Sequence, residues 1–331
     1  MSDEEKINLE SKETLEDKKL NLRPRNLDKF VGQDNLKSNL KTYIESSKKR
    51  KNNLDHIILY GPPGLGKTTL SHIISYEKNV NIHSTSGPAF TKKGDLVTLL
   101  TNLAEDDILF IDEIHRLSPI VEETLYPAME DYKCDYIIGS GPSARVMQIS
   151  IERFTLIGAT TRLGLLSRPL RDRFGIQLQL DFYNPSDLKN IILLSSKKFN
   201  TKIDESAAFE IAKRSRGTPR IAIRLLKRII DFSVVQNLPT ITDMGVEDSL
   251  KKMRLDSEGL DDMDRKYLKC IAIDYNGGPV GIETLSASLL EQKDIIEDVI
   301  EPYLMQQGLV QRTSRGRILS EKGHNHIQIT L

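Results

Sequence analysis

Short apolar runs alternate with longer amphipathic stretches between residues 54 and 180. Apolar runs of this kind are typical of strands that are buried on both faces of a sheet. They lie at His56–Tyr60, Val80–His83, Asp107–Asp112, Phe154–Ala159 and Ile176–Leu180. Because strands that alternate with helices form parallel sheets, the pattern predicts an α/β domain with helices on both faces of its sheet.

A hairpin is expected before the fourth of these strands. Two extended stretches flank the turn sequence Gly139-Ser-Gly-Pro142, so Tyr132–Ile151 is predicted to form an inserted hairpin. Ile137 and Ile138 lie next to its tip. Apolar residues in this place indicate either a surface that binds a partner protein or a hairpin that folds back on its own domain, and the pattern favours neither.

After Pro185 the periodicity becomes helical. Several helical segments predict a small all-α unit, and a later helix-turn-helix pattern with a final hairpin predicts a winged helix. The predicted parts are a solvated tail over residues 1–20, an α/β domain over 21–183, an all-α unit over 184–255 and a winged helix over 256–331.

Composition narrows the setting in which this chain works. It has 331 residues, no net charge, no tryptophan and two cysteines, Cys134 and Cys270, which lack the spacing of metal ligands. No apolar stretch approaches the length of a membrane span, and the first residues lack the pattern of a signal peptide. These features predict a cytoplasmic protein, and any contact with DNA must come from a local basic patch.

The segment Gly61–Thr69 reads Gly-Pro-Pro-Gly-Leu-Gly-Lys-Thr-Thr, which is a complete phosphate-loop motif. It follows a predicted strand and opens a predicted helix, as phosphate binding requires. The glycines let backbone amides surround a triphosphate, and the helix N-terminus adds partial positive charge. Lys67 is therefore expected to reach the β- and γ-phosphates, and Thr68 to bind Mg²⁺.

A second strand ends in two acids, Asp112 and Glu113. Ligands of parallel sheets bind beyond the carboxyl ends of the strands, so these acids are expected near Thr68. Asp112 would help to hold the hydrated Mg²⁺, and Glu113 would orient and deprotonate the attacking water. Together with the phosphate loop, the pair predicts hydrolysis of a nucleoside triphosphate.

Further candidates for contact with the γ-phosphate follow. If the Phe154–Ala159 strand lies between the phosphate-loop strand and the Asp112 strand, Thr161 lies close to that phosphate; otherwise Thr161 reflects β-propensity alone. Arg171 and Arg173 end a helix, and Arg220 begins one. Arginine suits phosphate binding, although each of these arginines taken alone also fits a surface ion pair.

The C-terminal hairpin is basic. Arg312, Arg315 and Arg317 surround Gly316, which permits a tight turn. On a wing, such arginines can neutralise DNA phosphates or enter a minor groove, whereas elsewhere a charged run is usually a solvated face. Lys293, at the start of the preceding helix, is a further candidate phosphate contact.

These motifs together resemble the RuvB family of AAA+ ATPases, over roughly residues 22–327. The resemblance rests on Arg23–Arg25, Val31–Gln33, Gly61–Thr69, Thr85–Pro88, Leu109–Arg116, Gly158–Arg162, Pro169–Gly175, Arg214–Arg220, Gly277–Gly281, Glu301–Tyr303 and Arg315–Arg317. It implies an AAA+ core, a helical lid and a winged-helix DNA-binding domain. It also implies a homohexameric ring that uses ATP and Mg²⁺ to drive branch migration of four-way junctions on duplex DNA. RuvA would bind the Tyr132–Ile151 hairpin, and RuvC would join a larger complex.

The resemblance also implies roles for single residues. The implied catalytic residues are Lys67, Asp112, Glu113, Thr161, Arg173 and Arg220, with Arg173 reaching the site of a neighbouring subunit and Arg171 as the alternative. Further nucleotide contacts are implied at Leu22, Arg23, Gly64, Gly66, Thr68, Thr69, Glu130, Asp131, Tyr132 and Tyr183, and DNA contacts at Lys293, Arg312 and Arg317. The chain departs from the family in residues 1–20 and at Arg168, where a small polar residue is usual.

Two other functions use the same nucleotide motifs. A clamp-loader-like or initiator AAA+ protein would use ATP to assemble a complex on DNA, and a transcription regulator could carry a vestigial nucleotide site. The hairpin at Tyr132–Ile151 and the element Gly277–Gly281 argue against the first. The intact Lys67, Asp112, Glu113 and Arg173 argue against the second.

Overall fold

The computed structural model describes the backbone of residues 23–138 and 145–330, and the side chains of residues 23–135 and 147–327. The predicted tail and Leu22 lie outside the described residues, as do the side chains of Ile137 and Ile138. The chain forms two compact units: the first runs to Gly61 and resumes over Gly66–Asp181, and the second comprises Pro62–Leu65 and the chain from Phe182 onward.

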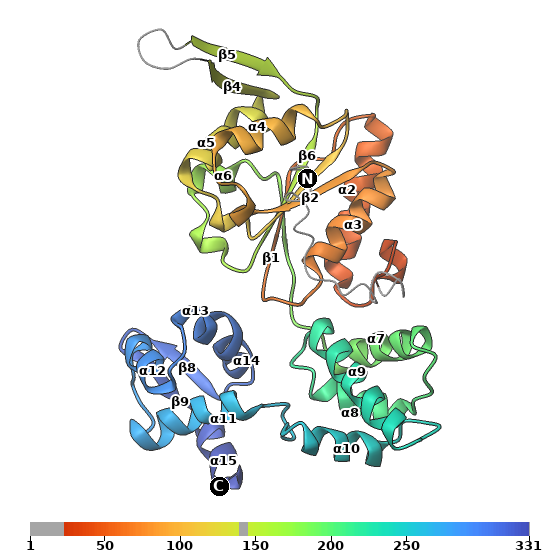
Figure 1. The fold of residues 1–331 in the computed structure, drawn as a ribbon, viewed down its shortest axis with the longest axis vertical. Helices are drawn as coiled ribbons and strands as arrows, with labels where there is room; N and C mark the ends of the chain where they lie inside the picture. The colour runs from red at the N-terminus through yellow and green to blue at the C-terminus, as the bar shows by residue number, and fades with distance from the viewer. Residues whose placement is uncertain (1–22, 139–144, 331) are drawn as a thin grey trace, which may run out of the picture. The chain divides into compact units, whose positions relative to one another are not determined.

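A parallel sheet with five strands forms the centre of the first unit (Figure 1). The strands are β1 (Ile57–Tyr60), β2 (Ile82–Ser86), β3 (Ile108–Asp112), β6 (Thr155–Thr160) and β7 (Ile176–Gln179). Their order is β2-β3-β6-β1-β7, and all neighbours are parallel. The condition set for Thr161 is therefore met, because β6 lies between the phosphate-loop strand β1 and the acidic strand β3.

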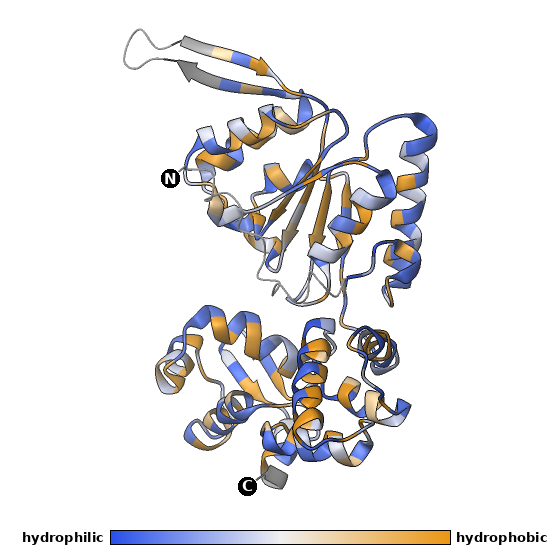
Figure 2. Ribbon diagram, turned by 45° about the vertical axis from the view of Figure 1, so that its right-hand side comes forward, coloured by the Kyte–Doolittle hydropathy of each residue, from blue (hydrophilic) through white to orange (hydrophobic). Residues whose placement is uncertain are grey.

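Helices cover both faces of this sheet, as predicted (Figure 1). α2 (Asp34–Arg50) and α3 (Lys67–Lys78) lie on one face, and α4 (Lys93–Thr101), α5 (Pro119–Glu130) and α6 (Arg168–Asp172) on the other. Leu109 and Ile111, two residues apart on β3, belong to one buried cluster with residues of α4 and α5. The central strands β1, β3 and β6 are mostly hydrophobic, which explains why apolar runs marked them in the sequence (Figure 2).

β2 begins later than the predicted Val80–His83 strand. Asn79 ends α3 in the left-handed conformation, with φ of 57°, and the Val80 amide donates to the Ser75 carbonyl at 3.2 Å. Val80 thus completes the helix end, and the strand forms only from Ile82. The apolar residue that seemed to open a strand is the first residue after a helix cap.

The predicted insertion is a hairpin of β4 (Lys133–Ile138) and β5 (Arg145–Ser150), in register from Lys133–Ser150 to Ile138–Arg145. At its base, Cys134 is fully buried and Ile149 packs against the core cluster. The strands then project away from the helices of their own unit (Figure 1). Met147 on β5 is 47% exposed. The described part of the hairpin is anchored at its base and does not fold back on the domain.

The second unit begins with four helices that form a small lid. They are α7 (Pro185–Lys198), α8 (Glu205–Lys213), α9 (Pro219–Val235) and α10 (Asp243–Lys252). Each of α7 and α9 has proline in its first turn and a capping side chain before it: Asn184 accepts from the Asp187 amide and Thr218 from the Ile221 amide. These two side chains accept amide hydrogens that would otherwise be free at the helix starts.

A winged helix completes the second unit. It consists of α11 (Asp262–Lys269), a π-helical turn η7 (Cys270–Asp274), α12 (Ile282–Leu289), α13 (Lys293–Ile295), η8 (Ile296–Ile300), α14 (Glu301–Gln306), the hairpin β8 (Val310–Thr313) and β9 (Gly316–Leu319), and α15 (Glu321–Thr330). It has its own core around the fully buried Tyr267 and Leu304. The sequence interpretation did not include α15. Within the described residues, none of the helices is long and apolar enough to cross a membrane.

Candidate nucleotide-binding and DNA-binding sites

The phosphate loop begins directly after β1 and ends at the first residue of α3. Gly61 has φ of 139°, and a Cβ there would lie 2.4 Å from the Leu180 carbonyl oxygen. Gly64 and Gly66 also have positive φ, at 83° and 103°. Only glycine adopts all three conformations without strain, so the backbone is free to curve around a phosphate group.

Lys67 opens α3 and is buried. Its ammonium group donates to the Gly61 carbonyl at 2.7 Å, so the lysine already points back along the loop. Gly66 caps the helix without a side chain, which leaves the amides of the first turn available to bind an anion. Thr68 and Thr69 follow in that turn, and both are partly buried.

The residues present fit a magnesium ion. Asp112 ends β3, is partly exposed, and accepts a hydrogen bond from the Glu113 amide at 3.0 Å. Among the residues whose placement is described, no group of three or more His, Cys, Asp or Glu side chains could hold a metal ion. Magnesium ions retain several waters and need one or two protein ligands beside the substrate phosphates, so Thr68 and Asp112 form a sufficient donor set.

Glu113 adopts a strained backbone. Its φ is 48°, in the left-handed region that a glutamate seldom occupies, and such residues concentrate at functional sites. Its carboxylate accepts from the Arg116 guanidinium at 2.9 Å, and the side chain is about half exposed. A second residue makes this turn possible, because a Cβ on Gly87 would lie 2.5 Å from the Glu113 carbonyl oxygen.

Replacing Gly87 with alanine is expected to slow ATP hydrolysis by up to about 100-fold, because the new methyl group would displace the Glu113 turn. Steady-state ATPase measurements test this prediction. Gly94→Ala is the matched control, since a Cβ at Gly94 meets nothing within 4 Å. Equal rates for the two variants would contradict the positioning role of Gly87.

Thr161 lies just beyond β6, whose last residue is Thr160. The Thr160 hydroxyl is 2.9 Å from Nδ1 of His115 and accepts from the Arg162 amide at 2.9 Å. This contact ties the end of β6 to the segment that carries Glu113. Sequence reasoning gave no role to His115; its place two residues after the acidic pair was the signal available.

Arg173 ends α6 and is held by residues of its own unit. Its guanidinium is 3.0 Å from the Glu130 carboxylate, donates to the Pro169 carbonyl at 2.7 Å and stacks 4.5 Å above the Tyr126 ring. Its Nε is buried and makes no hydrogen bond within the part of the chain that the structure describes. The structure thus brings Glu130 and Arg173 together, as two of the sequence-predicted nucleotide contacts.

The other predicted contacts near α5 and α6 lie apart from this pair. Asp131 is exposed, and the Tyr132 ring packs edge-on against Phe154 at 6.2 Å. Arg168 lies 3.5 Å from Asp172 in an exposed ion pair. Arg171 is partly buried on α6. Among the residues that the structure describes, no contact of Arg171 or Arg173 decides which of the two reaches a neighbouring subunit.

Arg23 lies within electrostatic range of α3, the helix that begins at Lys67. Burial, reinforced by the positive charge of Arg23, holds the pKa of His72 below its usual value. His72 lies on α3, five residues after Lys67. The Leu27 amide donates to the Glu77 carboxylate of α3 at 3.1 Å, so the N-terminal segment contacts the helix that carries Lys67, and the role of Arg23 in nucleotide binding stays a prediction.

The middle of the phosphate loop packs within the second unit. The Arg220 amide donates to the Gly64 carbonyl at 3.4 Å, and a Cβ on Gly64 would lie 3.1 Å from the Arg220 Cβ. The Tyr183 hydroxyl donates to the Leu65 carbonyl at 3.3 Å. Two residues predicted to contact nucleotide, Tyr183 and Arg220, are therefore in contact with the loop itself.

The wing arginines differ from the expected exposed basic tip. The Arg317 side chain is only 8% exposed and lies 2.8 Å from both Glu301 and Glu297. Arg312 is 44% exposed and lies 2.6 Å from the same Glu301. Burial, with the charge of Glu301, raises the pKa of Tyr267, so its hydroxyl stays protonated and donates to Glu301.

Lys293 and Arg315 are the more exposed basic residues of this region. Lys293 forms an ion pair with Glu283, and its side chain is 48% exposed. Arg315 is exposed at the turn of the β8–β9 hairpin, where its amide donates to the Thr313 hydroxyl at 3.3 Å. The DNA-binding roles of Lys293, Arg312 and Arg317 stay predictions.

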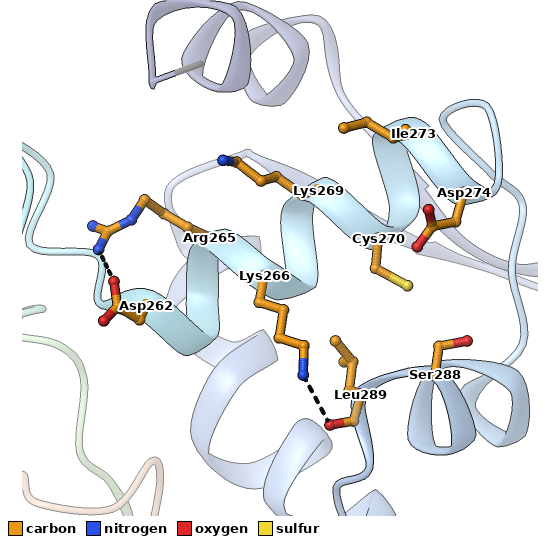
Figure 3. Close-up of a pocket in the computed structure, with 9 residues that line it drawn as sticks. All are labelled: Asp262, Arg265, Lys266, Lys269, Cys270, Ile273, Asp274, Ser288 and Leu289. Atoms are coloured by element: carbon orange, nitrogen blue, oxygen red, sulfur yellow. Dashed lines mark hydrogen bonds and ion pairs between the residues drawn. The ribbon is translucent and has the colours of Figure 1, made fainter.

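A pocket of about 340 Å³ lies on the winged helix, beside η7 and α12 (Figure 3). Lys266 donates to the Leu289 carbonyl across it at 3.5 Å, and burial raises the pKa of the Cys270 thiol on its wall. Its lining contains none of the predicted nucleotide or DNA contacts. It is thus separate from the residues that the motifs selected.

A phosphate loop after β1 and an acidic pair after β3, with a further strand between these two strands and a helical lid, define a P-loop ATPase of the AAA+ class. Three family models match successive parts of the chain: the Holliday junction DNA helicase RuvB P-loop domain at residues 22–180, the RuvB AAA lid domain at 183–256 and the RuvB C-terminal winged helix domain at 257–328. The chain belongs to the RuvB family.

Individual relatives agree with this assignment. A protein of Orientia tsutsugamushi (strain Ikeda), called Holliday junction branch migration complex subunit RuvB, is 54% identical over 319 residues, which cover 96% of this chain and 98% of that protein. The structure called Thermotoga maritima RuvB Holliday junction branch migration motor is 51% identical, with a TM-score of 0.86 over 93% of this chain and 98% of that chain. A lysine-to-arginine variant of the Thermotoga protein gives a TM-score of 0.87 at 50% identity.

Proposed function

We propose that this chain is the ATP-driven motor subunit of Holliday junction branch migration, acting in the cytoplasm on the DNA of the nucleoid. The observation that carries the proposal is the 54% identity to a branch migration subunit over 96% of the chain, which includes the ATPase core and the winged helix. This extent favours a motor over a clamp-loader-like or initiator ATPase and over a regulator with a vestigial site.

The residues of one subunit divide the work of ATP hydrolysis. The loop amides and Lys67 bind the triphosphate, Thr68 and Asp112 hold Mg²⁺, and Glu113 orients the attacking water and accepts its proton. When bound, Mg²⁺ supplies positive charge that offsets the charge on the phosphates. Thr161 and Arg220 contact the γ-phosphate, so that its loss is passed to β6 and to the lid.

Arg173 completes the site of a neighbouring subunit in a homohexameric ring. Its present partner Glu130 is 55% exposed, so the ion pair lies where a second subunit can reach it. The Arg173 side chain itself is 23% exposed, so the pair is only partly buried and Arg173 can exchange Glu130 for a phosphate of the neighbour. This interface contact would make hydrolysis in one subunit depend on the position of the next.

The β4–β5 hairpin and the winged helix are the parts of the chain that contact partners. RuvA binds the projecting β4–β5 hairpin near Ile137 and Ile138, and RuvC joins the assembly on the junction. The winged helix contacts duplex DNA through Lys293, Arg312 and Arg317. A direct phosphate contact by Arg317 would first require its bonds to Glu297 and Glu301 to open.

A synthetic four-way junction tests the proposal. With ATP, Mg²⁺ and a cognate RuvA, the protein is expected to convert the junction to duplex arms, and Lys67→Ala is expected to abolish conversion by removing the phosphate contact. Gel analysis of labelled arms measures the product. DNA-stimulated ATP hydrolysis without conversion would instead indicate a loader or initiator.

A further inference from the structure

The turn between α8 and α9 holds a buried arginine that the nucleotide and DNA motifs do not use. Arg216 has φ of 50°, and its side chain is 9% exposed. Its guanidinium leaves the lid and reaches the start of the winged helix, where Nε donates to the Gly259 carbonyl at 2.9 Å. Since a buried charge needs close partners, the groups around this guanidinium decide what it does.

Two carboxylates of the winged helix surround Arg216. Nη2 donates to Asp261 at 2.9 Å, and the two terminal nitrogens pair with both oxygens of Asp264, Nη1 at 3.4 Å. Asp261 is also the N-cap of α11, and the Asp264 carboxylate accepts from the Asp261 amide. Arg216 therefore binds the capping box of α11, which fixes where that helix begins.

Asp264 depends on this partner. The residue is 1% exposed, and burial raises its pKa to about 7. The positive charge of Arg216 lowers this pKa and so favours the ionised carboxylate. Without Arg216, the carboxylate would keep its desolvation and lose its main counter-charge, so the contact between lid and winged helix would loosen at this point.

A second helix of the winged domain joins the same contact. The Tyr303 ring of α14 lies 5.8 Å from the Arg216 guanidinium, within the range of a cation–π interaction. The Tyr303 hydroxyl donates to the Glu258 carbonyl at 2.7 Å, in the link between the domains. A Cβ on Gly259 would lie 2.5 Å from the Arg214 carbonyl oxygen, so the link backbone lies directly against the lid turn.

The other end of this short turn contacts the phosphate loop. Thr218 caps α9 two residues after Arg216, and a Cβ on Gly64 would lie 3.6 Å from Thr218 and 3.1 Å from Arg220. One turn of the lid thus contacts the loop through Thr218 and Arg220 and the winged helix through Arg216. A displacement of this turn cannot occur without moving α11 unless the Arg216 contacts break.

We propose that Arg216 is the positioning residue that makes the lid and the winged helix move as one body, so that a nucleotide-dependent movement of the lid reaches bound DNA. This inference rests on the proposed motor function. Arg216 acts through Asp261, Asp264 and the link at Gly259.

The test compares three variants of the full chain with RuvA and a four-way junction. Arg216→Ala removes the contact. Arg216→Lys keeps the charge beside Asp264, and so the fold, but a single ammonium group cannot form the same paired contact. Arg254→Ala is the matched control, because the Arg254 side chain lies in the same link, is 77% exposed and forms an exposed ion pair with Asp262 at 3.3 Å.

Basal ATP hydrolysis and binding to duplex DNA are expected to be retained in all three variants. Junction product per ATP hydrolysed, and stimulation of the ATPase by DNA, are expected to fall in Arg216→Ala by roughly 5- to 150-fold, the usual range for coupling between two sites. Arg216→Lys should lie between Arg216→Ala and the wild-type protein, and Arg254→Ala should match the wild type. If Arg216→Ala does not fold, Arg216→Lys decides the question.

Wild-type coupling in folded Arg216→Ala, or in Arg216→Lys where the alanine variant does not fold, would overturn the inference. An equal loss in Arg254→Ala would also overturn it, because the effect would then belong to the link in general. Failure of the motor proposal is distinguishable: the wild-type protein would convert no junction, while DNA stimulation of its ATPase would still report whether Arg216 couples the two domains.

Discussion

Replacing Glu113 with glutamine is expected to lower the rate of ATP hydrolysis by roughly 10²- to 10⁴-fold, the usual contribution of a general base. Glutamine preserves the size of the side chain and its acceptor oxygen but cannot take a proton from water. ATP binding should change little, because the loop amides and Lys67 do not depend on this carboxylate. Steady-state hydrolysis and equilibrium binding of a fluorescent ATP analogue measure the two quantities separately.

Glu105→Gln is the control for this substitution, since Glu105 is exposed and belongs to none of the motifs. Arg116→Ala adds a second comparison. Arg116 lies 2.9 Å from the Glu113 carboxylate, and its replacement removes this ion pair but keeps the carboxylate that serves as the base. A Glu113→Gln protein that binds ATP and hydrolyses it at the wild-type rate would show that another group is the base.

Replacing Arg173 with alanine is expected to lower ATP hydrolysis by roughly 10³- to 10⁵-fold, as the loss of an arginine finger does in other P-loop enzymes. The guanidinium stabilises charge that develops on the transferred phosphoryl group. Arg173→Ala also removes the hydrogen bond to Pro169 and the stacking on Tyr126, so circular dichroism has to show that the variant is folded before its rate is compared. Arg168→Ala is the control, since Arg168 is 84% exposed on the same helix.

A mixing experiment separates action on a neighbour from action within one subunit. Arg173→Ala keeps Glu113, and Glu113→Gln keeps Arg173, so a ring built from both contains some interfaces with every catalytic residue. Hydrolysis is expected to reappear on mixing two proteins that are each inactive. If the mixture stays inactive although mixed rings form, Arg173 acts in its own subunit.

The α/β core could be predicted because its central strands β1, β3 and β6 are mostly apolar. β1, β3, β6 and β7 lie within a residue of the predicted runs, although Gln177 and Gln179 alternate with apolar residues in the edge strand β7. The order of the strands could only be stated as a condition, because hydrogen bonding between β6 and its neighbours leaves no mark in a local pattern. The position of Thr161 depended on that condition.

Ion pairs between residues that are distant in sequence could not be predicted from local sequence patterns. Arg317 looked like a surface residue because its neighbours in sequence are basic and polar, but its partners Glu297 and Glu301 lie on a helix earlier in the chain. The same holds for Arg216, whose partners lie about 45 residues later. Motif spacing identifies residues that meet a shared ligand, and it does not reveal residues that meet each other.

The buried carboxylate of Glu301 also limits how this family of sequences can change. It accepts from Tyr267 and pairs with Arg312 and Arg317, while its side chain is 1% exposed. Loss of either arginine would weaken the charge compensation of this buried carboxylate, and loss of Tyr267 would remove one of its hydrogen bonds, so single replacements here are costly and their effects are not additive. These positions should therefore covary among homologues, and a wing with different DNA preferences would evolve by replacing the set together.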